Sequence, residues 1–485
     1  MSLKTNRRKR TIVVILITTM NALVLVLMFT DFDKNSNALV QTKRSLHSAE
    51  VAIGADLLSL FPELTNVSLN DLEPVLLTPR RKMRKKLVVG IPVVERKRNY
   101  ILETLTSLLG ELDEFHRKDI LFLVMFGCRQ SSSDFVTNTT ASIRRKFAKD
   151  IDDGLLQAAA IPTAYYKINI DDVPSTFDDS SQRMQWRTKQ SIDYIYLMAY
   201  ARTLGDHYMQ LEDDVVAAAS YARVIFNYLA FKGDKKWFYI EFSKIGFIGK
   251  LFRARELRDV VKAIALYYRY KPVDWILFDI IHCRYCRPDK GATDCIKVIK
   301  TAIIYSGAPQ FQHVGTVSSL LGKQQTIRDA NFGKGKAQAR SGYEPESGYA
   351  NNNAIWFQNV AKGGRMLVTF SAPITITGIM LLSGMPPAAK GKFGPETEVY
   401  VTFGGSGEAN KTLIGTFSPS GDFLFRSCLT TVKSLQIEVT EDLHEDVVVD
   451  HFIIDTGSRN CQSATNKREV DVLLPLSIES VSKWS

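Results

Sequence analysis

The sequence lacks several features that would place it in a familiar class at once. No A-x-A motif follows the apolar run near the N-terminus, which argues against a cleaved signal peptide. No second Cys-x-x-Cys motif and no spaced histidine pair accompany His282-Cys283-x-x-Cys286, which argues against a zinc site. Cysteine is scarce, with six residues in 485, and the even number indicates disulfides in an oxidising compartment.

An almost unbroken apolar run covers residues 12–29, directly after the basic stretch Arg7–Arg10. At about 1.5 Å per residue, a helix of this length spans roughly 27 Å, enough to cross a thin bilayer. Positive charge before the span keeps the N-terminus in the cytosol. We therefore expect a cytosolic tail over 1–11, a signal anchor over 12–30 and a type II membrane protein with a lumenal body.

Positive charge exceeds negative charge, with 62 Lys and Arg against 51 Asp and Glu, for a formal net charge of +11. The excess is unevenly placed. Five basic residues lie in the expected cytosolic tail, and six more cluster within residues 80–86, just before the first expected strand. This distribution indicates a solvated tail and linker, and it excludes nucleic acid as the expected partner.

Cysteines and glycosylation motifs also suit a lumenal chain. Cys428 and Cys461 both fall in the C-terminal region and are expected to pair with each other. The other four cysteines allow two bridges in any of three connectivities: Cys128, Cys283, Cys286 and Cys295. The N-glycosylation motifs are at Asn66, Asn138 and Asn410.

Residues 31–84 are polar with little apolar periodicity and are expected to form a stem. From residue 85, continuous apolar runs alternate with helical spacing. Strands are expected over 87–94, 120–126 and 207–211, and helices over 101–112, 187–204 and from about 220. This alternation predicts an α/β domain over 85–328, with an open, mostly parallel sheet and helices on both faces.

Beyond residue 328 the pattern changes to short alternating or β-branched runs separated by Gly, Pro, Ser and Asn. The runs cover residues 366–370, 374–382, 398–403, 432–439 and 447–454. Short strands with frequent turn residues predict a β-sandwich domain over 329–485.

The triplet Glu212-Asp213-Asp214 is the strongest chemical signal. It follows the expected strand 207–211 directly, and open α/β sheets bind ligands at the carboxyl ends of their strands. Adjacent carboxylates repel one another, and a hard divalent cation that also binds phosphate oxygens would compensate them. Without the preceding strand, a solvated acidic turn would be the better interpretation.

Six blocks of sequence, in this order, resemble the N-glycan β-1,4-N-acetylglucosaminyltransferase IV family, and the resemblance extends from about Lys86 to the C-terminus. It implies a GT-A (Rossmann-like) fold, an inverting reaction, UDP-GlcNAc as donor and Mn²⁺ or another divalent cation as cofactor. The blocks are Leu87–Val94, Arg187–Tyr194, Met209–Val215, Glu241–Lys250, Lys271–Leu277 and Phe311–Ser319.

The resemblance assigns roles only to matching positions. Asp214 is the expected metal ligand, and Glu212 and Asp213 are expected to contact the donor ribose and sugar. His313 is a further candidate for the metal or diphosphate, with a structural role as the alternative. The remaining candidates for donor binding are Pro92, Arg96, Arg98, Arg187, Lys189, Gly246, Gly249 and Lys250. For each basic residue among them, a solvated surface charge is the alternative.

An inverting transfer needs a general base that takes the proton from the acceptor hydroxyl. Asp274 is the candidate, because apolar neighbours are expected to raise its pKa, and Trp275 beside it is expected to stack on an acceptor sugar. The alternative is that Asp274 only caps a helix after Pro272. Asp279 is the substitute base.

The C-terminal domain resembles the carbohydrate-binding, lectin-like domain of the family more loosely. Aromatic residues that could stack on sugars include Tyr349, Trp356 and Phe357. Relatives carry an acidic sugar contact in the loop that corresponds to residues 384–395. This loop contains no Asp, which weakens the case for glycan binding there.

These features predict a Golgi membrane enzyme that transfers GlcNAc in β1,4 linkage to the α1,3-arm mannose of N-glycans. Its expected partners are N-glycans on glycoproteins, the Golgi membrane and other Golgi glycosyltransferases. The alternatives are a catalytically silent glycan-binding regulator of other transferases, or a transferase with a different acceptor. Retention of the acidic triplet and Asp274 favours an active enzyme.

Overall fold

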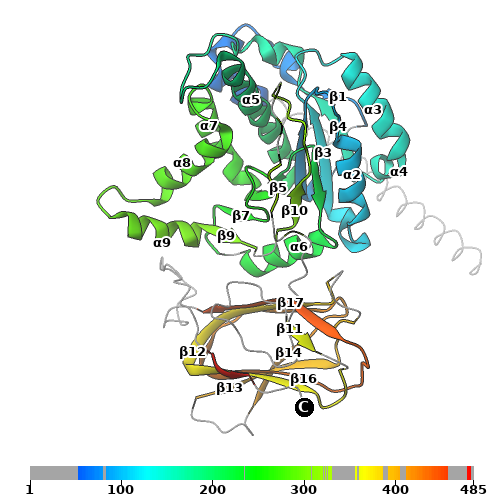
Figure 1. Ribbon diagram of the computed structural model, residues 1–485, viewed down its shortest axis with the longest axis vertical. Coiled ribbons are helices and arrows are strands. Elements are labelled where there is room, and N and C mark those ends of the chain that lie inside the picture. Colours follow the sequence, from blue (N-terminus) through cyan, green and yellow to red (C-terminus); the bar gives the residue numbers. More distant parts are fainter. Residues whose placement is uncertain are drawn as a thin grey trace, which may run out of the picture.

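A computed structural model describes most of the chain after residue 52 (Figure 1). The described residues are 53–79, 83–233, 235–306, 309–320, 322, 324, 326–329, 332, 355–357, 360–385, 391–404, 411–456 and 478–481. The predicted cytosolic tail and signal anchor lie outside these residues, as do Tyr349, Asn410 and Cys461. Among the helices of the described residues, none combines the length and apolar character needed to cross a bilayer.

An eight-stranded mixed sheet forms the centre of the first domain, with strand order β1-β4-β3-β2-β5-β8-β7-β9. The pairs β4-β3, β3-β2, β2-β5 and β7-β9 are parallel, so the predicted, mostly parallel α/β sheet is confirmed. The strands are β1 (Val75–Leu76), β2 (Lys85–Val93), β3 (Ile120–Phe126), β4 (Leu156–Ala160), β5 (Gly205–Gln210), β7 (Tyr239–Glu241), β8 (Lys250–Arg253) and β9 (Ile303–Tyr305).

Helices cover both faces of this sheet (Figure 1). Alternate residues of β2 and β3 face opposite sides, so each strand contributes to two separate apolar cores. On one side lie α2 (Ile101–Gly110), α3 (Asp134–Lys146), α4 (Ala148–Asp152) and α6 (Tyr221–Lys232). On the other lie α5 (Ser181–Leu204), α7 (Leu257–Tyr267) and α8 (Val273–Tyr285).

Helix α9 (Ala292–Ala302) follows α8, and the two project from the body of the domain (Figure 1). Two short strands, β6 (Val215–Ala217) and β10 (Phe311–His313), form a separate antiparallel pair. Short 3₁₀ helices complete this part of the chain: η1 (Pro62–Leu64), η2 (Asn70–Leu72), η3 (Glu114–Asp119), η4 (Thr163–Lys167) and η5 (Ala254–Glu256).

The structure differs from the prediction of a stem over residues 31–84. Within residues 53–79, Ile53, Leu57 and Phe61 are buried in the same core as α5 and α7. Strand β1 pairs with β4, and Arg144 donates two hydrogen bonds to the carbonyl of Leu77. This segment therefore belongs to the α/β domain. Residues 53–60 are helical, and Ile53, Leu57 and Phe61 recur at helical spacing, a signal that the prediction of a stem overlooked. After Phe61 the apolar residues follow turns and 3₁₀ helices and show no clean period.

The C-terminal domain is antiparallel, with strand order β11-β17-β12-β16-β13-β14, and β15 and β18 both pair with β12. The predicted strands over 366–370 and 374–382 are one strand, β12. The bounds are β11 (Ile355–Phe357), β12 (Arg365–Ser383), β13 (Thr397–Phe403), β14 (Thr412–Thr416), β15 (Asp422–Phe425), β16 (Leu429–Val439), β17 (Val447–Thr456) and β18 (Ile478–Val481).

Strand β12 explains why this domain is a curled, barrel-like sheet where two separate sheets of a sandwich were predicted. Its first part pairs with β16 and β18, and its last part pairs with β17 and β15. Register shifts lie between Thr369 and Ile376, and such irregularities bend a strand. One bent strand thus belongs to both layers of the domain (Figure 1).

Helix α6 joins the two domains through buried ion pairs. Arg223 lies 2.6 Å from Asp422 and also donates to the carbonyl of Ser383 at 2.8 Å. At the other end of α6, Lys232 lies 2.6 Å from Asp455. Residues of β12 and the loop after it, such as Met380 and Met385, belong to the same apolar core as α6. The domains are therefore packed together and are not simply tethered.

Asp450 on β17 lies near this interface and accepts a hydrogen bond from the backbone N–H of Met385 at 3.1 Å. Burial raises its pKa to about 7, although the Met385 hydrogen bond and the charge of Arg223 oppose the shift. In the unfolded chain an aspartate ionises near pH 3.9. Between these values the folded chain holds a proton that the unfolded chain has lost, so stability falls as pH rises.

We predict that Asp450→Asn raises the melting temperature at pH 8 and leaves it nearly unchanged at pH 4, because asparagine carries no ionisation penalty. Thermal unfolding of both proteins from pH 4 to pH 8 measures the effect. A constant difference between the two melting temperatures across this range would contradict the assignment.

Candidate functional site

The order of the strands places a crevice at the carboxyl ends of β2 and β5. From β2 the chain continues to β3 and β4 on one side and later returns to β5 on the other side of β2. Ligands bind where the strand order reverses in this way. Glu212-Asp213-Asp214 follows β5, and Arg96 follows β2, so the predicted acidic triplet lies at this point.

A cavity of about 1070 Å³ opens here. It brings together most of the residues that the sequence singled out: Pro92, Arg96, Arg187, Lys189, Glu212, Asp213, Asp214, Gly246, Asp274, Trp275 and His313. Three other predicted residues, Gly249, Lys250 and Asp279, are not among those that line it. Arg98 is also elsewhere, beside Glu103 at 3.1 Å and over the ring of Tyr100.

Two of the three carboxyl groups of the triplet are buried and share one guanidinium group. Arg96 donates to Asp214 Oδ2 at 2.9 Å and to Asp213 Oδ1. His313 Nε2 lies 3.4 Å from Asp214 Oδ2. Asp213 Oδ2 and Asp214 Oδ1 are buried and accept no hydrogen bond within the described structure. Arg96 was predicted to contact the donor, and it lies against the acidic triplet itself.

The three carboxyl groups differ in their affinity for protons. Burial raises the pKa of Glu212 to about 7 and that of Asp213 to about 8, and the neighbouring carboxylate Asp214 adds to both shifts. Burial also acts on Asp214, but the hydrogen bond from His313 and the charge of Arg96 outweigh it and lower its pKa. Asp214 is therefore the member of the triplet that is most readily ionised.

Glu212, Asp214 and His313 each place one ligand atom within 4.8 Å of the others. Carboxylate oxygens and an imidazole nitrogen suit a divalent cation such as Mn²⁺. The buried, unpartnered Oδ1 of Asp214 gives independent support, because such an atom is costly without a partner. The residues present thus fit a divalent cation.

A pairing between two short strands, which no local sequence pattern predicts, brings His313 next to Asp214. Strands β6 and β10 are antiparallel, with His313 opposite Val215, and the N–H of Val314 donates to the carbonyl of Asp214 at 2.9 Å. Gly315 comes next, and a Cβ atom there would lie 2.0 Å from Asp214 Oδ2. Glycine is required at this position because the carboxylate occupies the space that a side chain would need.

The block Glu241–Lys250 forms a tight loop beside the cavity. Gly246 and Gly249 adopt φ values of +46° and +69°, which favour glycine. Lys250 was expected to meet phosphate, but its Nζ donates to the carbonyls of Ser243 at 2.6 Å and Ile248 at 3.3 Å. It therefore holds the loop together from inside. Lys244, which the sequence analysis passed over, lines the cavity.

Arg187 and Lys189 line the cavity from α5, but carboxylates already neutralise both. Arg187 is buried, with its Nε 3.0 Å from Asp179 Oδ2. Lys189 Nζ lies 2.6 Å from Asp193 Oδ2 and donates to the carbonyl of Gly127 at 2.5 Å. These bonds give both side chains a clear role in holding the walls of the cavity.

Asp274 and Trp275 begin helix α8 at the edge of the cavity. Asp274 is exposed, so the apolar surroundings predicted for it are not found, and it makes no side-chain hydrogen bond as a helix cap. Trp275 is 49% exposed. Asp279 lies 2.6 Å from Lys271 in an ion pair outside the cavity. Of the two candidate bases, the geometry therefore favours Asp274.

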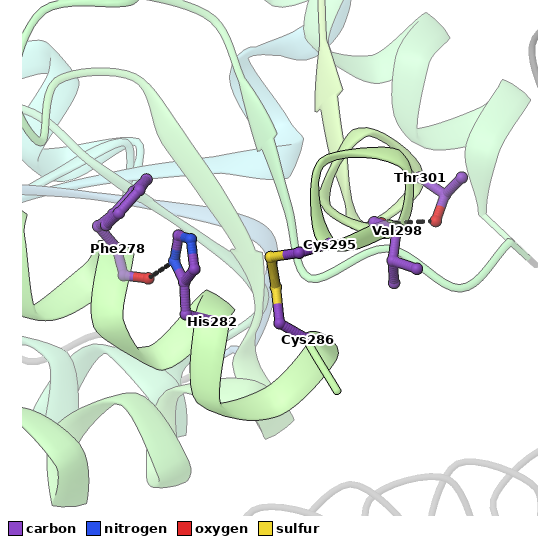
Figure 2. The surroundings of a disulfide bond; sticks show 6 residues. All are labelled: Phe278, His282, Cys286, Cys295, Val298 and Thr301. Atoms are coloured by element: carbon purple, nitrogen blue, oxygen red, sulfur yellow. Dashed lines mark hydrogen bonds between the residues drawn. A yellow bond between two sulfur atoms is a disulfide. The ribbon is translucent and has the colours of Figure 1, made fainter. Parts of the chain in front are cut away.

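A disulfide between Cys286 and Cys295 joins the end of α8 to α9 (Figure 2). Cys128 and Cys283 are free thiols, so the two bridges that the sequence allowed among these four cysteines do not form. Cys128 is buried beside the cavity at the end of β3, where burial raises its pKa to about 11, whereas Cys283 is exposed on α8. His282 lies near Cys286 and Cys295, and these two sulfurs are bonded to each other, so neither is available as a thiolate ligand for zinc.

Two of the predicted glycosylation sites, Asn66 and Asn138, are exposed, and Asn138 lies on helix α3. The third, Asn410, lies outside the described residues, and so does the predicted partner of Cys428, Cys461.

We predict that Gly315→Ala weakens Mn²⁺ binding by on the order of tenfold, because the new methyl group displaces the carboxylate of Asp214 without removing any ligand. Titration of the protein into Mn²⁺, followed by the electron paramagnetic resonance signal of the free ion, measures the affinity. Gly110→Ala is the control, since a Cβ atom there meets nothing within 4 Å. Equal affinity in the folded Gly315→Ala protein would rule out Asp214 as a ligand.

Comparison with known proteins gives matches over most of the chain. Residues 52–332 match the family model described as the MGAT4 conserved region. Alpha-1,3-mannosyl-glycoprotein 4-beta-N-acetylglucosaminyltransferase A of Gallus gallus is 34% identical over 316 residues, which are 62% of this chain and 58% of that protein. The B enzyme of Homo sapiens is 31% identical over 331 residues, 65% of this chain and 60% of that protein. The chain thus matches less than two thirds of either relative.

Among solved structures, Staphylococcus aureus TarS 1-349 aligns over 44% of this chain and 69% of its own length, with 11% identity and a TM-score of 0.25. This overlap is too low to define a shared fold. The family assignment depends on the sequence matches, because the family model alone covers more than half of the chain, including the acidic cluster after β5 and His313 on β10. The chain belongs to the MGAT4 family.

Proposed function

We propose that this protein is a GT-A glycosyltransferase that transfers GlcNAc from UDP-GlcNAc, with inversion, to the α1,3-arm mannose of N-glycans in β1,4 linkage. The observation that carries the proposal is the group Glu212, Asp214 and His313 at the carboxyl ends of the strands, facing a cavity with Asp274 at its edge. Family membership supports the same conclusion, since the matched relatives are named for this transfer.

In the proposed reaction the acidic cluster acts on the donor and the candidate base acts on the acceptor, at two sides of the cavity. Glu212, Asp214 and His313 would hold a divalent cation, which when bound neutralises charge on the departing diphosphate. Arg96 keeps Asp214 ionised, and Lys244 adds positive charge on the donor side. Glu212 and Asp213 would contact the donor ribose and sugar.

Asp274 takes the proton from the acceptor hydroxyl as its oxygen attacks the anomeric carbon of GlcNAc. The bond from that carbon to UDP breaks, and UDP leaves with the electron pair, so the configuration inverts in a single step. Asp274 is suited to this task because its side chain is exposed at the cavity edge, where an acceptor on a large glycoprotein can reach it.

The same proposal extends to the cellular setting. The protein would be a Golgi type II membrane protein, held by the predicted anchor over residues 12–30, with N-glycans on glycoproteins as acceptors. The lectin-like C-terminal domain, packed on α6, would accompany the catalytic domain as one body. Other Golgi glycosyltransferases are further candidate partners.

The test uses the full-length chain in detergent with UDP-GlcNAc, Mn²⁺ and an N-glycan that carries GlcNAc on its mannose arms. A product heavier by one GlcNAc, β1,4-linked to the α1,3-arm mannose and absent with a chelator, is the expected result. No product from a folded chain that still binds UDP-GlcNAc would instead favour a silent regulator or a different acceptor.

We predict that Asp274→Asn lowers the turnover number by about 10²–10⁴-fold, the usual contribution of a general base, while UDP-GlcNAc binding is unchanged. Asp279→Asn is the matched control, because Asp279 sits five residues later on the same helix, is paired with Lys271 and does not line the cavity. Initial rates with saturating donor measure both. Near-normal turnover in Asp274→Asn would show that another group accepts the proton.

A further inference from the structure

Two large aromatic side chains meet in solvent at the edge of the cavity. The rings of Phe177 and Trp275 lie 5.2 Å apart between centroids at an angle of 70°. Phe177 is 54% exposed and Trp275 49% exposed. Phe177 comes from the loop before α5, whereas Trp275 follows Asp274 at the start of α8. Their contact therefore joins two segments that are far apart in the sequence and presents apolar ring surface beside the candidate base.

The backbone at Phe177 is strained. Phe177 and Asp178 have φ values of +59° and +56°, and neither is glycine. For a bulky residue this conformation is a genuine outlier. Such strain persists only where the surrounding structure enforces it, and it concentrates at binding and catalytic sites.

Buried and directional contacts enforce this conformation. Arg187 lies 3.0 Å from Asp179 Oδ2 and also donates to Thr176 Oγ1, so it holds the loop on both sides of Phe177. Thr176 Oγ1 in turn donates to the carbonyl of Tyr270 at 2.7 Å, just before α8. The loop is thus fixed both to α5 and to the segment that leads into Trp275. Arg187 acts here as a positioning residue.

We propose that Phe177 and Trp275 form a platform that binds a pyranose ring of the acceptor glycan and orients its hydroxyl group toward Asp274. The C–H face of a pyranose is apolar and packs on aromatic rings, while its hydroxyl groups stay in water or reach polar groups. The acceptor is favoured over the donor as the occupant, because Phe177 is not among the residues that line the cavity, whereas the acidic cluster proposed to face the donor diphosphate is. This inference rests on the proposed glycosyl transfer.

The substitution that tests the platform is Phe177→Gly. Glycine adopts a φ of +59° without strain, so the variant removes the ring while it relieves the backbone. Asp178→Gly is the matched control, since the next residue has a similar backbone conformation and is also exposed, and its substitution leaves the ring in place. Phe177→Tyr keeps an aromatic face and should behave like the wild type.

The measurement is calorimetric binding of the GlcNAc-capped N-glycan to the full-length chain in the presence of UDP and Mn²⁺. We expect Phe177→Gly to weaken glycan binding by about tenfold, in the range of one lost aromatic contact, and to leave UDP affinity unchanged. Asp178→Gly and Phe177→Tyr should bind the glycan as the wild type does. Equal glycan affinity in Phe177→Gly, equal weakening in Asp178→Gly, or no glycan binding by the wild type would each overturn the platform.

Turnover measured on the same samples separates this inference from the proposed function. Glycan binding that depends on Phe177, without any product, would refute the transfer reaction and leave the platform intact. Product formation with full glycan affinity in Phe177→Gly would refute the platform and leave the reaction intact.

Discussion

The three consecutive carboxyl groups after β5 impose an electrostatic constraint that the surrounding structure satisfies. Asp213 and Asp214 are buried, and two buried, adjacent carboxylates cannot both remain ionised without nearby positive charge. Arg96, from the loop after β2, and His313, from β10, both converge on the same oxygen of Asp214 and lower its pKa, whereas burial raises the pKa of Asp213 to about 8. At the same place β10 pairs with β6, and Gly315, with no side chain, leaves room for the carboxylate of Asp214. Segments that are far apart in the sequence thus meet at one acidic cluster.

Several residues that were predicted to contact the donor instead hold the walls and loops around the cavity in place. Where many charged side chains lie close together, each needs a fixed partner, because it would otherwise form an ion pair with another side chain. Lys189 in the cavity wall is held by Asp193 and a carbonyl, and Lys250, which does not line the cavity, is held by the carbonyls of the adjacent loop. Charges fixed in this way are preorganised, so little reorganisation is needed when a substrate arrives. Arg187 is likewise held by an ion pair with Asp179, and this contact also fixes the loop that carries Phe177.

The sequence was most informative where periodicity or an adjacent motif carried the signal. The strand predicted at 120–126 is β3, and the acidic triplet lies at the predicted end of the sheet. It was least informative where contacts join distant segments. No local pattern indicates that His313 lies opposite Val215. The helical spacing of Ile53, Leu57 and Phe61 was overlooked, and the pairing of β1 with β4 that follows them is a long-range contact. The free thiols of Cys128 and Cys283 were missed for the same reason, since an even number of cysteines does not reveal which sulfurs can meet. The bend that makes two predicted strands into β12 likewise depends on its partners on both sides.

The contact between the two domains bears on how a large substrate could approach. Arg223 and Lys232 lie at opposite ends of α6 and each pairs with a carboxylate of the β domain, so the interface resists rotation about a single point. Gly378 has no side chain, so the ring of Phe231 can approach the backbone of β12 closely. A Cβ atom at Gly378 would lie only 2.8 Å from the ring of Phe231. Helix α6 packs on the sheet face opposite α5 and α8, whereas Phe177 and Trp275 stand at the α5 and α8 side. A glycan on the platform would therefore approach from the α5 and α8 face of the sheet, opposite the face on which α6 packs.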